Sequence, residues 1–352
     1  MSEQSSDAIR AFIRGLPKAE LHVHLEGVIE PELFLELAAV NRLATVYADA
    51  EAVRERLRHA RDLATFIEVY TEMLGVLISP DDFERVAISY VERVVAQGVR
   101  HVEMFFDPQM HTSRGIPLDV VMQGLLAAQR RAQADHGLAV FFIAAFNRDR
   151  SAESAWQHLD LLLKWRELVV GVGLDNLEEP GFPAKFAPLF EHAAALGFRL
   201  TTHVDVDVTN TLDHHRDALR LLGVERLDHG LGTLELPEVM ESVCERGIGI
   251  TACPTMLYQE LPGRYEDHLE RARLLLKAGA KVSLHSDDPG LMRSLYIGDL
   301  YQLAWERGGC TRSELLAFAR NSFASAWIDP DTQRKHLKAV DSWVAEHAFL
   351  EF

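Results

Sequence analysis

The stretch Leu21-His22-Val23-His24-Leu25-Glu26-Gly27 is an apolar run near the N-terminus that carries two imidazoles separated by one residue. Successive side chains of an extended chain point to opposite faces, so His22 and His24 point the same way and can reach one metal ion. A His-x-His pair alone is a weak signal, because two histidines at a strand edge often bind nothing. The metal hypothesis gains weight from potential ligands at the ends of three other apolar runs: His203, His229 and Asp287-Asp288. Neutral imidazole and carboxylate are ligands that zinc prefers.

Apolar runs of strand length recur along the rest of the chain. The first predicted strand is residues 19–25, and seven more follow at 99–106, 138–146, 169–174, 198–204, 226–229, 249–253 and 281–285. Longer stretches with helical periodicity separate them, for example at 82–97, 118–135, 152–168, 186–196, 212–222 and 265–277. Alternating strands and helices indicate a parallel sheet, and nearly uniform apolar strands indicate that both its faces are covered. Eight such units predict an α/β fold of the (β/α)8 TIM-barrel type.

The domain organisation follows from the same pattern. We expect one barrel domain over residues 1–352, with a helical insertion at about 30–80 and C-terminal helices at about 294–350. An open dinucleotide-binding sheet is the alternative, but Gly171-Val172-Gly173 lacks the third glycine of that motif.

The positions of polar residues support a barrel, because the chemistry of such barrels sits at the C-terminal ends of the strands. Polar residues are found where each predicted strand ends: His22 and His24, Asp107, Asn147 and Arg148, Asp175, His203 and Asp205, Asp228 and His229, Thr255, and Asp287 and Asp288. His22, His24, His203 and Asp287 together could hold one divalent ion and leave a position for water. A bound cation lowers the pKa of its water toward neutrality and so produces hydroxide that attacks an electrophilic carbon.

Composition excludes several classes of partner. The chain has 53 acidic and 36 basic residues, a formal charge of -17, which disfavours nucleic acid polymers and anionic membrane surfaces. Its three cysteines are widely spaced and include no Cys-x-x-Cys, so neither a disulfide framework nor a thiolate zinc site is indicated. The N-terminus lacks the pattern of a signal peptide. We therefore expect a cytoplasmic protein that acts on a small molecule. The composition is also compatible with a homo-oligomer.

Three longer motifs resemble the adenosine and adenine deaminases of the metal-dependent amidohydrolase superfamily. They are Leu16-Pro17-Lys18-Ala19-Glu20-Leu21-His22-Val23-His24-Leu25-Glu26-Gly27, Leu227-Asp228-His229-Gly230 and Ser286-Asp287-Asp288-Pro289. The segments Glu30-Pro31-Glu32-Leu33, Phe105-Phe106-Asp107-Pro108-Gln109-Met110-His111-Thr112 and Gly173-Leu174-Asp175 are more similar to the adenine branch than to the nucleoside branch.

The resemblance implies a role for each matching residue. It implies one Zn²⁺ per chain on His22, His24, His203 and Asp287. It also implies that His229 orients the attacking water and that Asp288 hydrogen-bonds the purine ring. The substrate side would further include His24, Asp175 and Glu178, the last an acid near the Asp175 turn. His111 is read as a loop histidine, and His214-His215 as a solvated helix start.

One departure from the family concerns proton transfer. Family members follow the third zinc histidine with Ala-Gly-Glu, whose glutamate protonates the ring, whereas this chain reads His203-Val204-Asp205-Val206-Asp207. A missing general acid costs roughly 10²-fold to 10⁴-fold in rate unless another group replaces it. Asp205 is the preferred replacement, since it shares a strand face with His203, and Asp207 is the second choice.

The leading functional hypothesis is a zinc-dependent aminohydrolase that removes the 6-amino group of adenine, adenosine or a close analogue as ammonia. A hydrolase of the same superfamily that acts on an N6-substituted purine or another heterocycle is the alternative. A catalytically silent paralogue that keeps its zinc is the third possibility, which the Val206 replacement leaves open. Cytidine-type deaminases are excluded, because their Pro-Cys-x-x-Cys motif does not occur.

Overall fold

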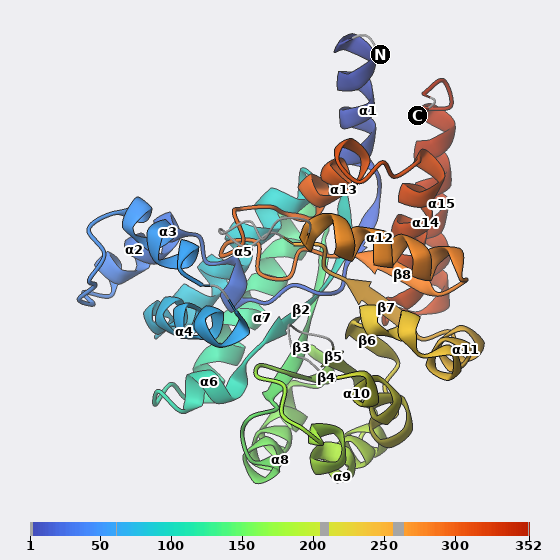
Figure 1. Ribbon diagram of the computed structural model, residues 1–352. Coiled ribbons are helices and arrows are strands. Elements are labelled where there is room, and N and C mark those ends of the chain that lie inside the picture. Colours follow the sequence, from blue (N-terminus) through green and yellow to red (C-terminus); the bar gives the residue numbers. More distant parts are fainter. Residues whose placement is uncertain (1–2, 61, 205–210, 256–263, 351) are drawn as a thin grey trace.

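Eight parallel strands form one sheet in which each strand pairs with the next in sequence. The computed structural model describes residues 3–352 except 61, 205–210, 256–263 and 351. The strands are β1 (Lys18–Glu20), β2 (Val99–Phe106), β3 (Ala139–Asn147), β4 (Val169–Asp175), β5 (Arg199–Val204), β6 (Arg226–His229), β7 (Gly249–Ala252) and β8 (Lys281–Leu284). Helices surround them (Figure 1). The predicted TIM-type fold is confirmed, and β2 and β6 have the predicted bounds.

The two edges of the sheet meet at the C-terminal ends of β1 and β8. There Val23 and Asp287 form a parallel bridge just beyond the two strands. The amide of His24 donates to the carbonyl of Asp287 (3.0 Å), and the amide of Asp287 donates to the carbonyl of His22 (3.0 Å). Closure therefore brings the His-x-His segment and the Asp287-Asp288 segment side by side.

The first strand is shorter than predicted. Regular pairing in β1 stops at Glu20, and only isolated bridges at Val23 and His24 continue the extended segment. The reason lies at Leu21, whose amide donates to Nδ1 of His285 (3.1 Å) and not to a strand carbonyl. His22 and His24 therefore lie beyond the strand, on a segment that side chains and bridges hold in place.

The helices and short helical turns connect the strands. Before β2 come α1 (Glu3–Gly15), η1 (Glu26–Val28), α2 (Pro31–Val40), α3 (Ala50–Arg58), α4 (Leu63–Met73), η2 (Leu74–Val76) and α5 (Pro80–Val95). Between β2 and β6 lie α6 (Pro108–Thr112), α7 (Leu118–His136), α8 (Ala152–Leu162), η3 (Leu163–Trp165), α9 (Phe182–Ala195), α10 (Leu212–Asp217) and η4 (Ala218–Leu222). The rest are η5 (Leu231–Glu235), α11 (Pro237–Arg246), α12 (Arg264–Lys277), α13 (Ile297–Glu306), α14 (Arg312–Ser325) and α15 (Pro330–Glu346).

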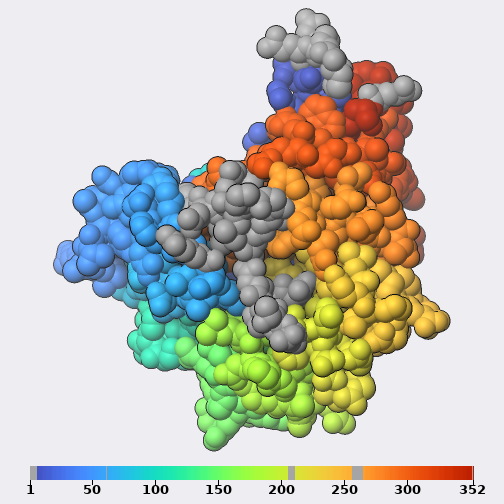
Figure 2. Space-filling view, in the orientation of Figure 1, coloured from blue at the N-terminus to red at the C-terminus, as the bar shows by residue number. Residues whose placement is uncertain are grey.

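The helices between β1 and β2 extend the molecule to one side. Helices α2 and α3 form a lobe that projects from the barrel at the left of the space-filling view (Figure 2). Helix α4 lies closer in and supplies four residues to the pocket described below: Leu63, Phe66, Ile67 and Tyr70. Among the described helices none is by itself long and apolar enough to cross a membrane, and one pair that passes jointly, residues 63–76 and 80–95, is bent by 120°.

The first and last helices pack against each other on the far side from this lobe. The indole of Trp343 in α15 donates to the carbonyl of Phe12 in α1 (3.1 Å), and the two rings stack at 6.3 Å. A further contact closes the base of the barrel, where the amide of Ala19 in β1 donates to the hydroxyl of Ser322 in α14 (2.8 Å). The C-terminal helices therefore cover the gap between β1 and β8 below the bridge.

Candidate metal centre and active site

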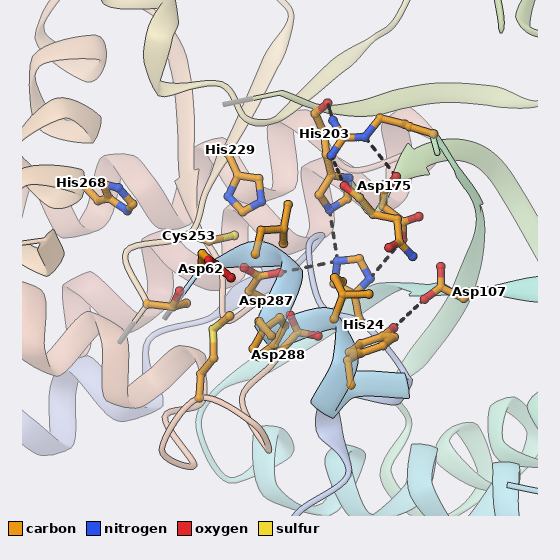
Figure 3. A pocket seen from close by; sticks show the side chains of 18 residues that line it. His24, Asp62, Asp107, Asp175, His203, His229, Cys253, His268, Asp287 and Asp288 are labelled. Carbon is orange, nitrogen blue, oxygen red and sulfur yellow. Dashed lines mark hydrogen bonds and ion pairs between the residues drawn. The ribbon is translucent and has the colours of Figure 1, made fainter. Parts of the chain in front are cut away.

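Four candidate donor atoms converge at the C-terminal rim of the barrel. Nε2 of His24 lies 3.1 Å from Nε2 of His203. Oδ1 of Asp287 lies 3.4 Å from Nε2 of His22 and 3.5 Å from Nε2 of His24. In a tetrahedron with ligand distances of roughly 2.1 Å the donors are about 3.4 Å apart, so this spacing suits one zinc-sized ion. Figure 3 shows His24, His203 and Asp287 around the same space.

Hydrogen bonds on the far side of two rings fix which nitrogen faces this space. Nδ1 of His203 donates to the carbonyl of Leu174 (3.0 Å). The hydroxyl of Thr251 donates to Asp228 (2.8 Å), so its oxygen accepts from Nδ1 of His22 (3.0 Å). Each Nε2 therefore carries a lone pair, as metal coordination requires. Nε2 of His22 is buried and has no hydrogen-bond partner among the described residues, and a metal ion would supply one.

Carboxylates behind the histidines complete this arrangement. Oδ2 of Asp175, at the end of β4, lies 3.7 Å from Nδ1 of His24. Asp228 accepts from the hydroxyls of Thr201 (2.6 Å) and Thr251 and lies 3.6 Å from Nδ1 of His203. Carboxylates in such positions orient metal-binding imidazoles and raise their basicity. The donor set therefore fits a divalent metal ion.

His229 and Asp288 lie beside the donor set. The His229 ring centroid is 4.8 Å from that of His22 and 5.3 Å from that of His203. Burial lowers the pKa of His229 well below its usual range, which keeps the imidazole neutral. Oδ1 of Asp288 is buried and, within the part of the chain that the structure describes, has no hydrogen-bond partner, so this pocket-lining carboxyl can bond a ligand.

The two adjacent aspartates differ in their charge. Burial opposes the ionisation of both. The imidazoles around Asp287, His22 first among them, nevertheless hold its pKa well below the usual range. Burial and then the negative charge of Asp287 raise the pKa of Asp288 well above it. Asp287 is therefore a carboxylate suited to bind a cation, and Asp288 can donate a proton in a hydrogen bond.

A second group of acids extends from the metal centre toward α4. The hydroxyl of Tyr70 lies 2.7 Å from Oδ2 of Asp107 and 3.1 Å from Oε2 of Glu26. Glu26 also bonds His111 (2.6 Å), so His111 is a buried residue of α6 and not a loop histidine. Burial raises the pKa of Asp175 to about 7 and that of Asp107 well above its usual range.

Many of these groups line one pocket that is partly open to solvent, among them His24, Tyr70, Asp107, Asp175, His203, His229, Asp287 and Asp288. Its lining includes residues that the sequence analysis did not place in the site: Asp62, Leu63, Phe66, Ile67, Tyr70, Asn176, Cys253, His268 and Met292. The four residues of α4 repeat at helical spacing, a pattern that sequence reasoning assigns to a core. Asp107 and Arg148 also line the pocket, and their positions at strand ends were the available signal.

The chain is similar to known proteins over nearly its whole length. The family model described as adenosine deaminase matches residues 17–343, nearly the whole chain. The chain belongs to the adenosine deaminase family. This family consists of metal-dependent hydrolytic deaminases, and the donor set above agrees with membership.

Relatives and solved structures cover almost the full length of this family member. An uncharacterized deaminase of Schizosaccharomyces pombe is 39% identical over 339 residues, 96% of this chain and 99% of that one. An adenine deaminase of Streptomyces coelicolor is 39% identical over 331 residues, 93% of this chain and 96% of that one. The solved adenine deaminase of Arthrobacter aurescens is 33% identical with a TM-score of 0.86, covering 94% and 99%. A zinc-bound amidohydrolase of Burkholderia ambifaria is 29% identical with a TM-score of 0.85, covering 97% and 95%.

Two expectations from the family resemblance need correction. Glu178 does not line the pocket; its buried carboxylate accepts from Nδ1 of His214 (2.6 Å) and lies 3.7 Å from Nη1 of Arg148. His214 and His215 are buried and do not form a solvated helix start, since α10 packs against the 178–182 turn and η5. Paired charges explain the burial of Glu178, which the sequence could not reveal. Asp205, with Val206 and Asp207, lies outside the described residues.

Proposed function

We propose that this chain is a zinc-dependent deaminase of a 6-aminopurine such as adenine, adenosine or a close analogue. Water adds through oxygen to C6, and the exocyclic amine leaves as ammonia. The observation that carries the proposal is the set of three imidazole nitrogens and one carboxylate oxygen at coordination spacing, with His229 and Asp288 beside it. The adenine deaminase names of two 39% and 33% identical proteins support the substrate class.

The proposal assigns a separate task to each residue. A divalent cation held by His22, His24, His203 and Asp287 supplies Lewis-acid chemistry that lowers the pKa of water. His229, neutral and beside this set, orients the attacking water and accepts its proton. Asp288, with a buried unpaired oxygen, hydrogen-bonds the purine ring and so positions C6. Asp175 orients His24 from behind.

Protonation of the ring needs an acid that the family pattern does not provide here, since Val206 occupies the glutamate position. We assign this task to Asp205, two residues after His203. The support is the sequence position alone. If Asp205 moves the proton, Asp205→Asn retains zinc and fold but loses activity by roughly 10²-fold or more, because the amide has no titratable proton. The matched control is Asp207→Asn, which stays within about threefold of wild type; an inactive Asp207→Asn with an active Asp205→Asn contradicts the assignment.

A second candidate, deamination of an N6-substituted purine, has one observation in its favour. Helix α4 lines the pocket with the apolar side chains of Leu63, Phe66 and Ile67, which suit a hydrocarbon substituent on N6. In this case the product amine carries the substituent.

A substrate screen with zinc-loaded protein tests the proposal. The substrates are adenine, adenosine, N6-methyladenine and N6-alkyladenines with longer chains, followed by ultraviolet absorbance and by assay of the released amine. Ammonia from adenine or adenosine supports the first candidate, and alkylamine release without adenine turnover supports the second. Absence of turnover with every aminopurine contradicts both and favours a catalytically silent purine-binding protein. The same proposal places the protein in the cytoplasm, for which the support is that all three cysteines are free.

A further inference from the structure

A buried arginine joins the ends of the three strands on one side of the metal centre. Arg148 follows β3, and its side chain is fully buried. Its Nη1 donates to the carbonyl of His203 (2.7 Å), its Nε to the carbonyl of Asp175 (3.0 Å) and its Nη2 to the carbonyl of Asn176. One guanidinium therefore ties the end of β4 and the end of β5 to the end of β3.

Two of these three carbonyls belong to residues that act at the metal centre. His203 supplies a donor nitrogen, and the carboxylate of Asp175 faces Nδ1 of His24. The planar fork of arginine presents several N–H groups in a fixed arrangement, whereas the ammonium of lysine is a single point. Arg148 can therefore hold two donor histidines in place. It bonds the backbone carbonyl of His203 directly, and it fixes Asp175, whose carboxylate faces His24.

Arg148 is itself fixed from behind by a buried pair. Oε2 of Glu178 lies 3.7 Å from Nη1, and Oε1 accepts from Nδ1 of His214 (2.6 Å). The amide of Gly181 donates to Nε2 of His214 (3.2 Å), which fixes the tautomer of that ring. The guanidinium also lies over the ring of Phe182, at 5.0 Å. A buried guanidinium loses its hydration, and these partners offset the free-energy cost of that loss.

We infer that Arg148 is a positioning residue for the metal centre, and that Glu178 and His214 hold Arg148 in place. This inference rests on the proposed function only in assuming that the four donors bind an ion. Under this inference the role of Glu178 is to hold Arg148, and not to contact the substrate. The competing explanation is that Arg148 merely satisfies carbonyls at strand ends and stabilises the fold.

The barrel offers a matched control for that explanation. Arg226, at the start of β6, is also fully buried, forms an ion pair with Glu103 and lies over the ring of Trp327 at 3.6 Å. It sits at the opposite ends of the strands from the metal centre. Removing Arg226 therefore deletes a buried guanidinium without touching a donor.

The experiment measures zinc affinity by competition with a chromophoric chelator, in the absence of substrate, for wild type, Arg148→Met and Arg226→Met. Thermal midpoints are recorded alongside. We expect Arg148→Met to bind zinc about 10-fold to 100-fold more weakly, the range for loss of a group that orients metal ligands. Arg226→Met keeps zinc affinity within about threefold of wild type even where its midpoint falls. Equal zinc affinity in wild type and Arg148→Met overturns the inference.

Two further variants keep the test decisive if Arg148→Met does not fold. Arg148→Lys retains the charge but is shorter and reaches fewer carbonyls, so it weakens zinc binding and alters the visible spectrum of the Co²⁺-loaded protein. In Arg148→Ala, millimolar guanidinium restores zinc affinity and equimolar urea does not. An unchanged Co²⁺ spectrum in Arg148→Lys overturns the inference. If wild type itself binds no ion, the proposed function fails as well; if wild type binds zinc and the Arg148 variants bind it equally well, only the inference fails.

Discussion

Two residues of the metal centre have backbone angles that few residues other than glycine adopt. His229 has φ of 61° and Asp287 has φ of 61°, both in the left-handed region. Such conformations cost on the order of 1–3 kcal/mol and persist where the surrounding structure imposes them. Each residue ends a segment at the rim, where a left-handed turn directs the side chain into the pocket. The backbone strain is therefore found at residues whose side chains must point toward the metal centre.

The residues beside the donor set can be separated from the donors by mutation. We expect His229→Ala and Asp288→Asn to keep about one zinc per chain and to lose turnover by roughly 10²-fold or more, as when a positioned acid or base is removed. His203→Ala instead loses stoichiometric zinc, because a tetrahedral site loses its geometry with one ligand. Elemental analysis and steady-state kinetics on the same samples check both. Loss of zinc from His229→Ala and Asp288→Asn would make them ligands.

Gly27 gives a prediction about the space that Asp288 needs. A Cβ at Gly27 would lie 1.8 Å from Oδ1 of Asp288, so Gly27→Ala displaces that carboxyl. We expect turnover to fall about 10²-fold with zinc retained, since the position of Asp288 and not the donor set is disturbed. Gly75→Ala is the control, because nothing lies within 4 Å of its added Cβ. Equal activity of the two variants would show that Asp288 is not needed where the structure places it.

Among the helices and strands, the elements whose bounds could be predicted from the hydrophobic pattern are those whose residues are buried. Strands β2 and β6 were predicted with their observed bounds, and nearly all of their residues are buried, as expected for strands covered on both faces. The first strand was predicted too long, since a hydrogen bond from Leu21 to the His285 side chain ends its pairing. A side chain more than 250 residues away leaves no local pattern in the sequence.

The same limit applies to the candidate site. The donor residues could be predicted, because they sit at strand ends and carry metal-binding chemistry. The wall formed by Phe66 and Tyr70 could not, because helical spacing of apolar residues predicts a core position equally well. Nor could the pairing of Glu178 with His214, which depends on how α10 packs. Contacts between polar groups that are distant in the sequence leave no local pattern from which they could be predicted.

Glu103 of β2 and Arg226 of β6 pair inside the barrel at the ends opposite the metal centre, and this pair sets a pH dependence of stability. Although burial opposes ionisation, Arg226 and His101 hold the pKa of Glu103 at about 2. A carboxyl with a depressed pKa in the folded state adds stability above its unfolded pKa of about 4.5, and that stability is lost as pH falls toward 2.

The corresponding test compares metal-free wild type with Glu103→Gln in urea unfolding. The glutamine variant lacks the titration, so the difference in unfolding free energy between the two proteins shrinks by roughly 1.4 kcal/mol from about pH 6 to about pH 3.5. At neutral pH the variant is less stable yet binds zinc as wild type does, because Glu103 touches no donor. A difference that is independent of pH would show that the ion pair does not act as described.

At the scale of the whole molecule, the barrel separates stability from chemistry. One end of the strands carries the Glu103–Arg226 pair, and the other carries the donors, the acids and the pocket. This division is general for such barrels, in which the loops after the strands hold the reacting groups. It explains why residues from β1, β5 and β8, far apart in sequence, meet around one space.

The central claim is that one divalent ion on the four donors drives deamination of a 6-aminopurine. The most direct test titrates metal-free protein with zinc and follows ammonia release from adenine at each step. We predict that activity rises linearly to one equivalent of zinc per chain and then stays level. Activity in the metal-free protein, or no ammonia at one bound equivalent, would contradict it.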